Sequence, residues 1–331
     1  MEIRLYDPFE NLYLDPHTCF LTGEDLQSDD EQIPVFPSWV IERYALQNTK
    51  FVMMDQFTGF LYPDLKIPCS RHVIANVIDP LEKEIETAFI AGYAAVKALP
   101  EERLFQWMCK MVYGVLYNDL LVEKKKSAKR QKEFKLSPAL QRRFKKLHLM
   151  LQSLVVPMSF EGLKPWSISI VKVQYSKDVF NYRDEPTNMN FSLGMNGFGI
   201  VACLQDNGAV GRYQEKLLSK ILDKTLHPVQ FEELCARFIY SNYLLTSFAK
   251  HNIDIKESGV VVESIPMTDE PDKPLFAQWD DNMFAQVLAE YWKPWGITKN
   301  DIYMPPDSPI SYLENDFNYE FIEPDSISLP Y

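Results

Sequence analysis

The sequence has no long hydrophobic stretch. Nothing in its 331 residues approaches the run of about 18 consecutive apolar residues that marks a membrane-spanning helix. Its N-terminus lacks the basic segment followed by an apolar run that is typical of a secretory signal peptide. Cysteine is scarce, and its five residues, an odd number, do not indicate a disulfide framework. These absences predict a chain that works in the reducing cytoplasm without a membrane partner.

Several catalytic motifs are also absent. The sequence contains neither the Gly-x-x-x-x-Gly-Lys-Ser/Thr phosphate loop nor the Gly-x-Ser-x-Gly nucleophile motif. Gly194, Gly197 and Gly199 have the wrong order for a dinucleotide-binding loop. The dipeptide Asn196-Gly197 instead predicts a type I′ turn that joins two strands, because both residues readily adopt positive φ angles.

Charge is distributed unevenly along the chain. The net charge of −12 argues against a general attraction to nucleic acid or to anionic lipid. Residues 123–146, however, hold eleven Lys or Arg and two acidic residues, a local charge of +9, which leaves −12 − 9 = −21 for the remainder. From Asp301 onward there are seven acidic residues and no Lys or Arg.

The basic segment allows two interpretations. Its lysines could neutralise phosphates of a nucleic acid, with Lys124, Lys125, Lys126, Lys129 and Arg130 as the candidate contacts. Alternatively, it is a solvated linker followed by an amphipathic helix with outward-facing lysines. The lysine-dense half contains no aromatic residue on which bases could stack, which favours the second interpretation.

Hydrophobic periodicity predicts an α+β protein with two domains, at residues 1–155 and 156–331. The first should contain a small irregular N-terminal element with short paired strands near 50–54 and 59–62. Helices should follow at about 79–99, 101–121 and 138–154. The second should be mixed α and β. We expect a strand at 167–175, an antiparallel hairpin at 190–204, helices at 213–222, 228–246 and 282–292, a strand at 260–262, and an acidic, proline-rich tail.

Three segments in the first domain form a recognisable series. His17-Thr18-Cys19-Phe20-Leu21-Thr22-Gly23 is a cysteine turn. Glu31-Gln32-Ile33-Pro34-Val35-Phe36-Pro37-Ser38-Trp39-Val40 follows, and then Cys69-Ser70-Arg71-His72. This series resembles a degenerate member of the HNH-type, treble-clef endonuclease-like family. Leu81-Glu82, Trp107-Met108-Cys109-Lys110 and the later segment 228–234 add to the resemblance, which covers about 120 residues.

The resemblance implies a ββα metal element in which a histidine activates water beside one divalent ion. Gln32 stands where that histidine belongs, and an amide cannot serve as a general base near neutral pH. Val73 and Ile74 occupy positions where the family has asparagines, and Asn76 is out of register. The usual nuclease chemistry is therefore not expected.

The family's structural zinc poses a separate question. His17, Cys19, Cys69 and His72 offer four nitrogen or sulfur ligands, the number that a tetrahedral zinc site needs. However, Thr22 replaces the second cysteine of the first turn. The alternative is that the two cysteines are small buried side chains and the two histidines lie at the surface. No cofactor is expected unless this zinc site is retained.

Three functional hypotheses follow. The first is a catalytically silent HNH-like protein that binds nucleic acid or a protein partner. The second is a metal-dependent endonuclease in which His17 or His72 replaces the missing base and converges with Glu31 or with Asp29 and Asp30. The third is a structural or interaction protein with no role in nucleic-acid binding.

Overall fold

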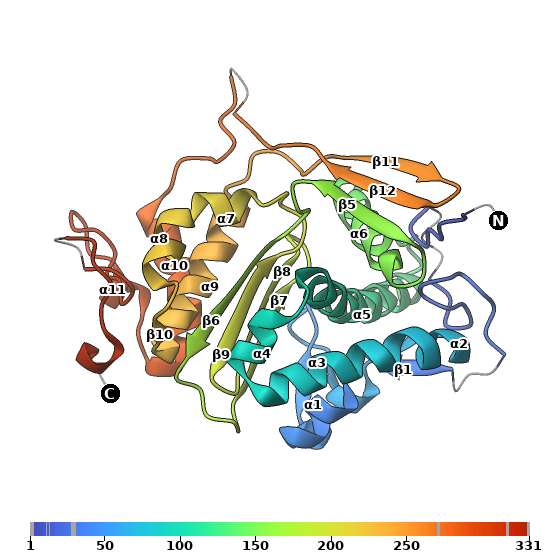
Figure 1. The fold of residues 1–331 in the computed structure, drawn as a ribbon, viewed down its shortest axis with the longest axis horizontal. Coiled ribbons are helices and arrows are strands. Elements are labelled where there is room, and N and C mark those ends of the chain that lie inside the picture. The colour runs from blue at the N-terminus through green and yellow to red at the C-terminus, as the bar shows by residue number, and fades with distance from the viewer. Residues whose placement is uncertain are drawn as a thin grey trace. The chain divides into compact units, whose positions relative to one another are not determined.

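The computed structural model describes residues 3–10, 12, 14–27, 31–269, 272–315 and 318–329. Helices alternate with mostly antiparallel strands, so the predicted α+β class is confirmed (Figure 1). The chain divides into two compact units. Unit 1 comprises Met1–Ala91, Ala98–Glu161 and Asn252–Glu263, and unit 2 comprises Gly92–Lys97, Gly162–His251 and Ser264–Tyr331. The sequence did not predict that two short segments would exchange units: Gly92–Lys97 belongs to unit 2 and Asn252–Glu263 to unit 1.

Unit 1 contains three small sheets and a set of helices. Its strands are β1 (Gln32–Pro34), β2 (Lys50–Val52), β3 (Gly59–Leu61), β4 (Lys66–Pro68), β5 (Met158–Gly162), β11 (His251–Lys256) and β12 (Gly259–Ser264). They pair as β1-β4, β2-β3 and β11-β12-β5. Its helices are α1 (Ser38–Arg43), α2 (Arg71–Val73), α3 (Asp79–Ala91), α5 (Glu101–Lys129) and α6 (Pro138–Leu151). Shorter turns are η1 (Leu46–Asn48), η2 (Tyr62–Asp64), η3 (Ile74–Ile78) and η4 (Gln152–Leu154).

Helix α5 is the centre of unit 1. Its 29 residues are buried almost continuously from Leu104 to Tyr117, which fits a helix surrounded by other elements. Gly114 is required by this packing, because a Cβ atom there would lie 2.7 Å from Cγ2 of Val35. The segment that follows β1 therefore packs directly against the backbone of α5.

The predicted helix at 79–99 begins correctly at Asp79, the first residue of α3, but it ends too late, and the sequence missed the helical turns that precede it. Helix α2 already begins at Arg71, and a π-helical turn, η3, leads into α3 without a break. We attribute the wide turn to Pro80, whose ring in a regular helix would clash with the carbonyl group of Asn76. Gly92, with φ of +90°, then ends α3. A separate helix, α4 (Tyr93–Ala98), follows in unit 2.

Unit 2 is built on a five-stranded sheet with the order β10-β6-β9-β8-β7. The strands are β6 (Ser167–Val173), β7 (Phe180–Glu185), β8 (Asn190–Met195), β9 (Phe198–Cys203) and β10 (Thr225–Leu226). The further helices are α7 (Ala209–Tyr213), α8 (Glu215–Ile221), α9 (Pro228–Tyr243), α10 (Asp281–Trp292) and α11 (Lys299–Ile302), with turns η5 (Lys293–Trp295) and η6 (Pro324–Ser326). Helices α9 and α10 pack together beside the sheet (Figure 1).

The predicted hairpin in unit 2 is confirmed. Strands β8 and β9 pair antiparallel from Asn190 opposite Cys203 to Met195 opposite Phe198. The two-residue turn between them has φ of 42° at Asn196 and 81° at Gly197, as a type I′ turn requires. Every residue of both strands is buried, so this hairpin lies at the centre of the sheet.

The C-terminal tail is bound to its own chain by buried polar side chains of α9. The Gln230 amide donates hydrogen bonds of 2.7 Å to the carbonyl oxygens of Tyr312 and Ile322. The Glu233 carboxylate, fully buried, accepts hydrogen bonds from the backbone N–H groups of Tyr312 and Leu313. These contacts place the tail against α9 within unit 2. In the described part of the chain, no helix is both long and apolar enough to cross a membrane.

Candidate functional site

Cys19 lies in a tight turn of unit 1. The Cys19 N–H group donates a 2.8 Å hydrogen bond to the Glu24 carbonyl, and the Gly23 N–H group donates one of 3.0 Å to the Cys19 carbonyl. Gly23 has φ of +73°, and a Cβ atom there would lie 2.5 Å from Cδ2 of Tyr6. Both the backbone conformation and the available space therefore require glycine at this position.

Cys69 approaches this turn from the end of β4, which pairs antiparallel with β1. Its N–H group donates a 2.9 Å hydrogen bond to the carbonyl of Glu31, which precedes β1. The Phe20 N–H group donates a 2.9 Å hydrogen bond to the carbonyl of Pro68, the last residue of β4. Helix α2 begins at Arg71, two residues after Cys69. A cysteine turn, a two-stranded sheet and the start of α2 thus meet around the two thiols.

The two thiols contact each other. Cys19 and Cys69 are fully buried, and the Cys69 thiol donates a hydrogen bond to the Cys19 sulfur. This bond, together with donors from the Thr22 hydroxyl and from the backbone N–H groups of Thr22 and Ser70, lowers the pKa of Cys19 to about 5. The pKa of Cys69 is raised, because its proton is held by Cys19 and the group is buried.

The two histidines of the predicted zinc site lie at the surface. His17 and His72 are exposed, and the His72 Nδ1 atom lies 3.1 Å from the amide nitrogen of Asn76. Among the residues that the structure describes, no group of three or more His, Cys, Asp or Glu side chains is arranged to hold a metal ion. Of the four predicted ligands, the structure thus brings together Cys19 and Cys69 but does not add His17 or His72 to them.

The residues to which the sequence resemblance assigned catalytic positions make other contacts in the structure. Gln32 is exposed on β1, opposite Pro68. Glu31 is buried, forms an ion pair of 3.2 Å with Arg71 and accepts a hydrogen bond from the N–H group of Gln27. Val73 is buried on the following helix. The residues proposed as partners of a displaced histidine, Asp29 and Asp30, lie outside the described residues.

The motif residues on α3 and α5 form a polar contact between these helices. Lys110, whose side chain is 1% exposed, places its Nζ atom 2.5 Å from Oε1 of Glu82. The indole N–H of Trp107 donates a 3.0 Å hydrogen bond to Oε2 of the same carboxylate. Glu82 therefore satisfies two buried donors on α5. Sequence spacing alone did not reveal this pairing, because 28 residues separate Lys110 from Glu82.

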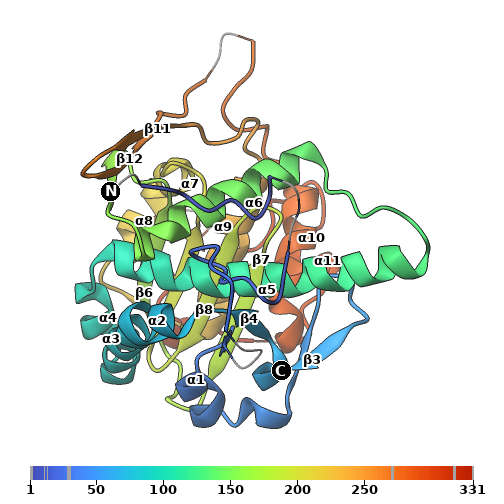
Figure 2. The ribbon, with the colours of Figure 1, turned by 90° about the vertical axis from the view of Figure 1, so that its right-hand side faces the viewer.

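The first half of the basic segment is helical, whereas one of the two sequence interpretations made it a solvated linker. Helix α5 continues to Lys129, and Lys124, Lys125, Lys129 and Arg130 are all exposed. In Figure 2 the C-terminal end of α5 and the loop to α6 extend past the other elements of unit 1. Lys126 differs from its neighbours, because it forms ion pairs with Asp55 and with Glu123.

Other cations of the basic segment have acidic partners. Lys145 forms an ion pair of 2.5 Å with Asp7, and Lys135 forms one of 2.8 Å with Glu133. By contrast, six exposed cations of the segment have no carboxylate partner among the described residues. Lys132 and Arg142 lie in the following loop and on α6, and the other four lie at the end of α5: Lys124, Lys125, Lys129 and Arg130. We call these four the α5 cations. A cation without a counter-charge in its own fold is available to an external anion.

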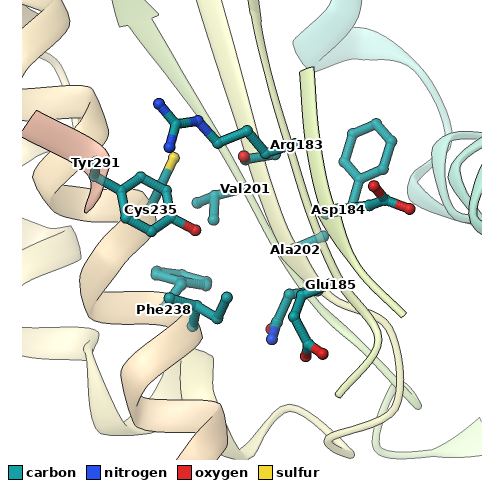
Figure 3. Close-up of a pocket in the computed structure, with 12 residues that line it drawn as sticks. Arg183, Asp184, Glu185, Val201, Ala202, Cys235, Phe238 and Tyr291 are labelled. Carbon is teal, nitrogen blue, oxygen red and sulfur yellow. The ribbon is translucent and has the colours of Figure 1, made fainter. Parts of the chain in front are cut away.

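Unit 2 contains a buried charged cluster, which the sequence did not predict. Figure 3 shows two of its members, Arg183 and Tyr291, beside the cavity that they help to line. Glu232 on α9 is 3% exposed and lies 3.3 Å from Nη2 of Arg183, whose guanidinium stacks over the ring of Tyr291 at 4.7 Å. Burial raises the pKa of Glu232, and Arg183 opposes this shift. The adjoining cavity, lined by Arg183, Cys235 and Tyr291 among others, has a volume of about 10 Å³, roughly the space of one water molecule. The cluster is therefore better suited to holding the sheet and helices together than to binding a ligand.

Comparisons with protein families, with characterised proteins and with solved structures gave no match for this chain. Function must therefore be argued from the residues themselves. Two features of unit 1 could take part in chemistry or binding: the thiol pair Cys19–Cys69 and the α5 cations.

Proposed function

We propose that this protein is a catalytically silent, HNH-like binding protein that contacts nucleic acid through the α5 cations. The observation that carries the proposal is the exposure of these four cations at the projecting C-terminal end of α5, with no carboxylate partner among the described residues. Neutralisation of phosphates by such side chains is the main source of affinity in non-specific nucleic-acid binding.

The spacing of the α5 cations supports this role. Lys125 and Lys129 are four residues apart, so they lie on the same face of α5 and are separated by about 6 Å along its axis. Successive phosphates of one strand are separated by about 3.4 Å along the duplex axis, so this distance is about two phosphate steps. The overall charge of −12 would restrict binding to this local patch.

The end of α5 is also held in place. The Met54 N–H group donates a 3.0 Å hydrogen bond to Oδ1 of Asp119, and Asp55 pairs with Lys126. Both bonds tie the loop between β2 and β3 to α5. A fixed helix presents its cations at lower entropic cost than a mobile linker would, which strengthens binding.

The residues at the family's catalytic positions support binding without cleavage. Gln32 has no basic lone pair, and the buried Glu31 carboxylate is already paired with Arg71. A nuclease activity would need a general base from elsewhere in the chain. We therefore propose no hydrolytic step.

The test is fluorescence anisotropy with labelled duplex DNA, single-stranded DNA and RNA of equal length. The test variant changes all four α5 cations to Glu. A matched control changes four exposed lysines of unit 2 to Glu: Lys97, Lys177, Lys216 and Lys250. Both variants then carry the same net charge, −12 − 8 = −20. We expect the test variant to lose binding and the control to keep most of it. Equal losses in both variants would contradict the proposed site, and no binding by the unmodified protein would contradict the function.

A further inference from the structure

The loop between β2 and β3 carries the most exposed large hydrophobic side chain among the described residues. Phe57 is 94% exposed, and Val52 and Met54 on the same hairpin are about half exposed. A large apolar side chain gains stability when it leaves water, and this ring gains almost none from its own fold. Both faces of the Phe57 ring are therefore open to an external group.

This loop is held in shape by its own hydrogen bonds. The Met53 N–H group donates a 2.8 Å hydrogen bond to the Thr58 carbonyl, and the Gln56 N–H group donates one of 2.9 Å to the Met53 carbonyl. The Asp55 carboxylate accepts hydrogen bonds of 2.9 and 2.8 Å from the N–H groups of Phe57 and Thr58. The backbone that carries the ring is thus ordered in advance, which lowers the entropic cost of binding.

The Asp55 carboxylate also joins this loop to the end of α5. It forms an ion pair with Lys126, and Lys129 and Arg130 follow three and four positions later on the same face of that helix. In Figure 2 the β2-β3 hairpin reaches toward the C-terminal end of α5. Phe57 and the α5 cations therefore belong to neighbouring parts of one surface of unit 1.

The distribution of charge decides which part of a nucleic acid meets each side of this surface. Lys126 is shared between the carboxylates of Asp55 and Glu123, so the surface beside Phe57 has no surplus positive charge. A phosphate gains nothing there, whereas an uncharged base can stack on the ring. The α5 cations, which have no carboxylate partner among the described residues, are placed to hold the adjoining phosphates.

We propose that Phe57 and the α5 cations together form a site for single-stranded nucleic acid, in which Phe57 stacks on an unpaired base. This inference rests on the proposed function and names the kind of nucleic acid that the site takes. The faces of duplex bases are covered by their neighbours, so a duplex binds here through its phosphates alone. In a single strand the faces are open, and stacking on an aromatic ring adds affinity for any base.

The test is fluorescence anisotropy with labelled strands of equal length: single-stranded DNA, single-stranded RNA, duplex DNA, and an abasic DNA strand that keeps its phosphates. The unmodified protein should bind single-stranded DNA more tightly than the abasic strand. Phe57→Ala should weaken binding of single strands about 5- to 150-fold. Its binding of duplex and abasic DNA should not change. The DNA and RNA arms show which backbone the site prefers.

Further variants separate stacking from other effects. Phe57→Trp should bind single strands at least as tightly as the unmodified protein, whereas Phe57→Leu should recover little, because an aliphatic side chain has no ring face. Tyr243→Ala is the matched control, since Tyr243 is 71% exposed in unit 2, and it should bind every strand normally. Because Phe57→Ala removes no phosphate contact, the dependence of its binding on salt should be unaltered.

The outcomes distinguish this inference from the proposed function. Equal affinity of the unmodified protein for intact and abasic single strands would overturn the stacking site but leave the phosphate contacts in place. Phe57→Ala binding every strand normally would also overturn it, as would an equal loss on duplex and single strands. If the unmodified protein binds no strand at all, both the proposed function and this inference are wrong.

Discussion

Replacing Glu82 by glutamine should destabilise unit 1 far more than a comparable change nearby. In the folded protein the Lys110 ammonium is almost completely buried and lies 2.5 Å from the Glu82 carboxylate. The introduced amide would keep an acceptor for the Trp107 indole but would leave the Lys110 charge uncompensated. Breaking one side of a buried ion pair costs about 3–5 kcal/mol. For a unit of this size, that corresponds to a fall in Tm of about 6–20 °C.

The same helix offers a matched control. Glu84 on α3 forms an ion pair of 2.9 Å with Arg103, but both side chains are about one-third exposed. Glu84→Gln should therefore lower the free energy of unfolding by less than about 1 kcal/mol. Lys110→Met combined with Glu82→Gln should recover part of the loss, because the double variant no longer buries an unpaired charge.

Thermal and urea denaturation, followed by tryptophan fluorescence and circular dichroism, would measure these differences. Equal decreases in the free energy of unfolding for Glu82→Gln and Glu84→Gln would refute the importance of the buried pair. So would a double variant as unstable as the sum of both single variants, since a true pair must be non-additive.

Three further predictions concern stability and the tail. Burial raises the pKa of Asp119 to about 6. Between about pH 4 and 6 the folded protein therefore holds a proton that the unfolded chain has lost. The free energy of unfolding should fall as the pH rises through this window. Asp119→Asn should flatten that part of a plot of Tm against pH, whereas an unchanged plot would contradict the assignment. Gly114→Ala should lower the free energy of unfolding, measured by urea denaturation, by about 1–3 kcal/mol, because the new Cβ atom would collide with Val35. If this contact is the cause, adding Val35→Ala should restore part of the lost stability. Gln230→Leu should speed limited proteolysis within residues 303–329, since two backbone carbonyls lose their donor, and an unchanged cleavage rate would show that other contacts hold the tail.

The sequence predicted those elements whose signals are local. Both the turn at Asn196-Gly197 and the start of α6 were predicted correctly. At the start of α6 the Ser137 side chain accepts a hydrogen bond from the Leu140 N–H group, and Pro138 is the first helical residue. Each depends on backbone preferences of two or three adjacent residues, so no distant contact is needed to recognise it.

Other elements could not be predicted because their cause is tertiary. Strands β1 and β4 have only three residues each and are fixed by pairing across more than thirty positions. The extension of α5 beyond Leu121 has few apolar residues, and contacts from Asp55 to Lys126 support it. Periodicity carries no information about such partners, so the sequence alone favours a linker there.

The candidate site was only partly accessible from the sequence. Cys19 and Cys69 were singled out by their motif, and the structure places them in contact. Their spacing could not reveal that His17 and His72 would lie at the surface. The α5 cations were identified by charge density alone, which cannot show that the adjacent Lys126 is held by Asp55.

The most direct test of the proposed function is the salt dependence of nucleic-acid binding. If the four α5 cations neutralise four phosphates, the logarithm of the association constant should fall with a slope of about −3.6 against the logarithm of salt concentration. Affinity should then drop about 150-fold between about 50 and 200 mM salt. Reversal of the four cations should remove that slope, whereas the charge-matched control in unit 2 should keep it. A slope that is the same in both variants, or binding that does not respond to salt, would contradict the account.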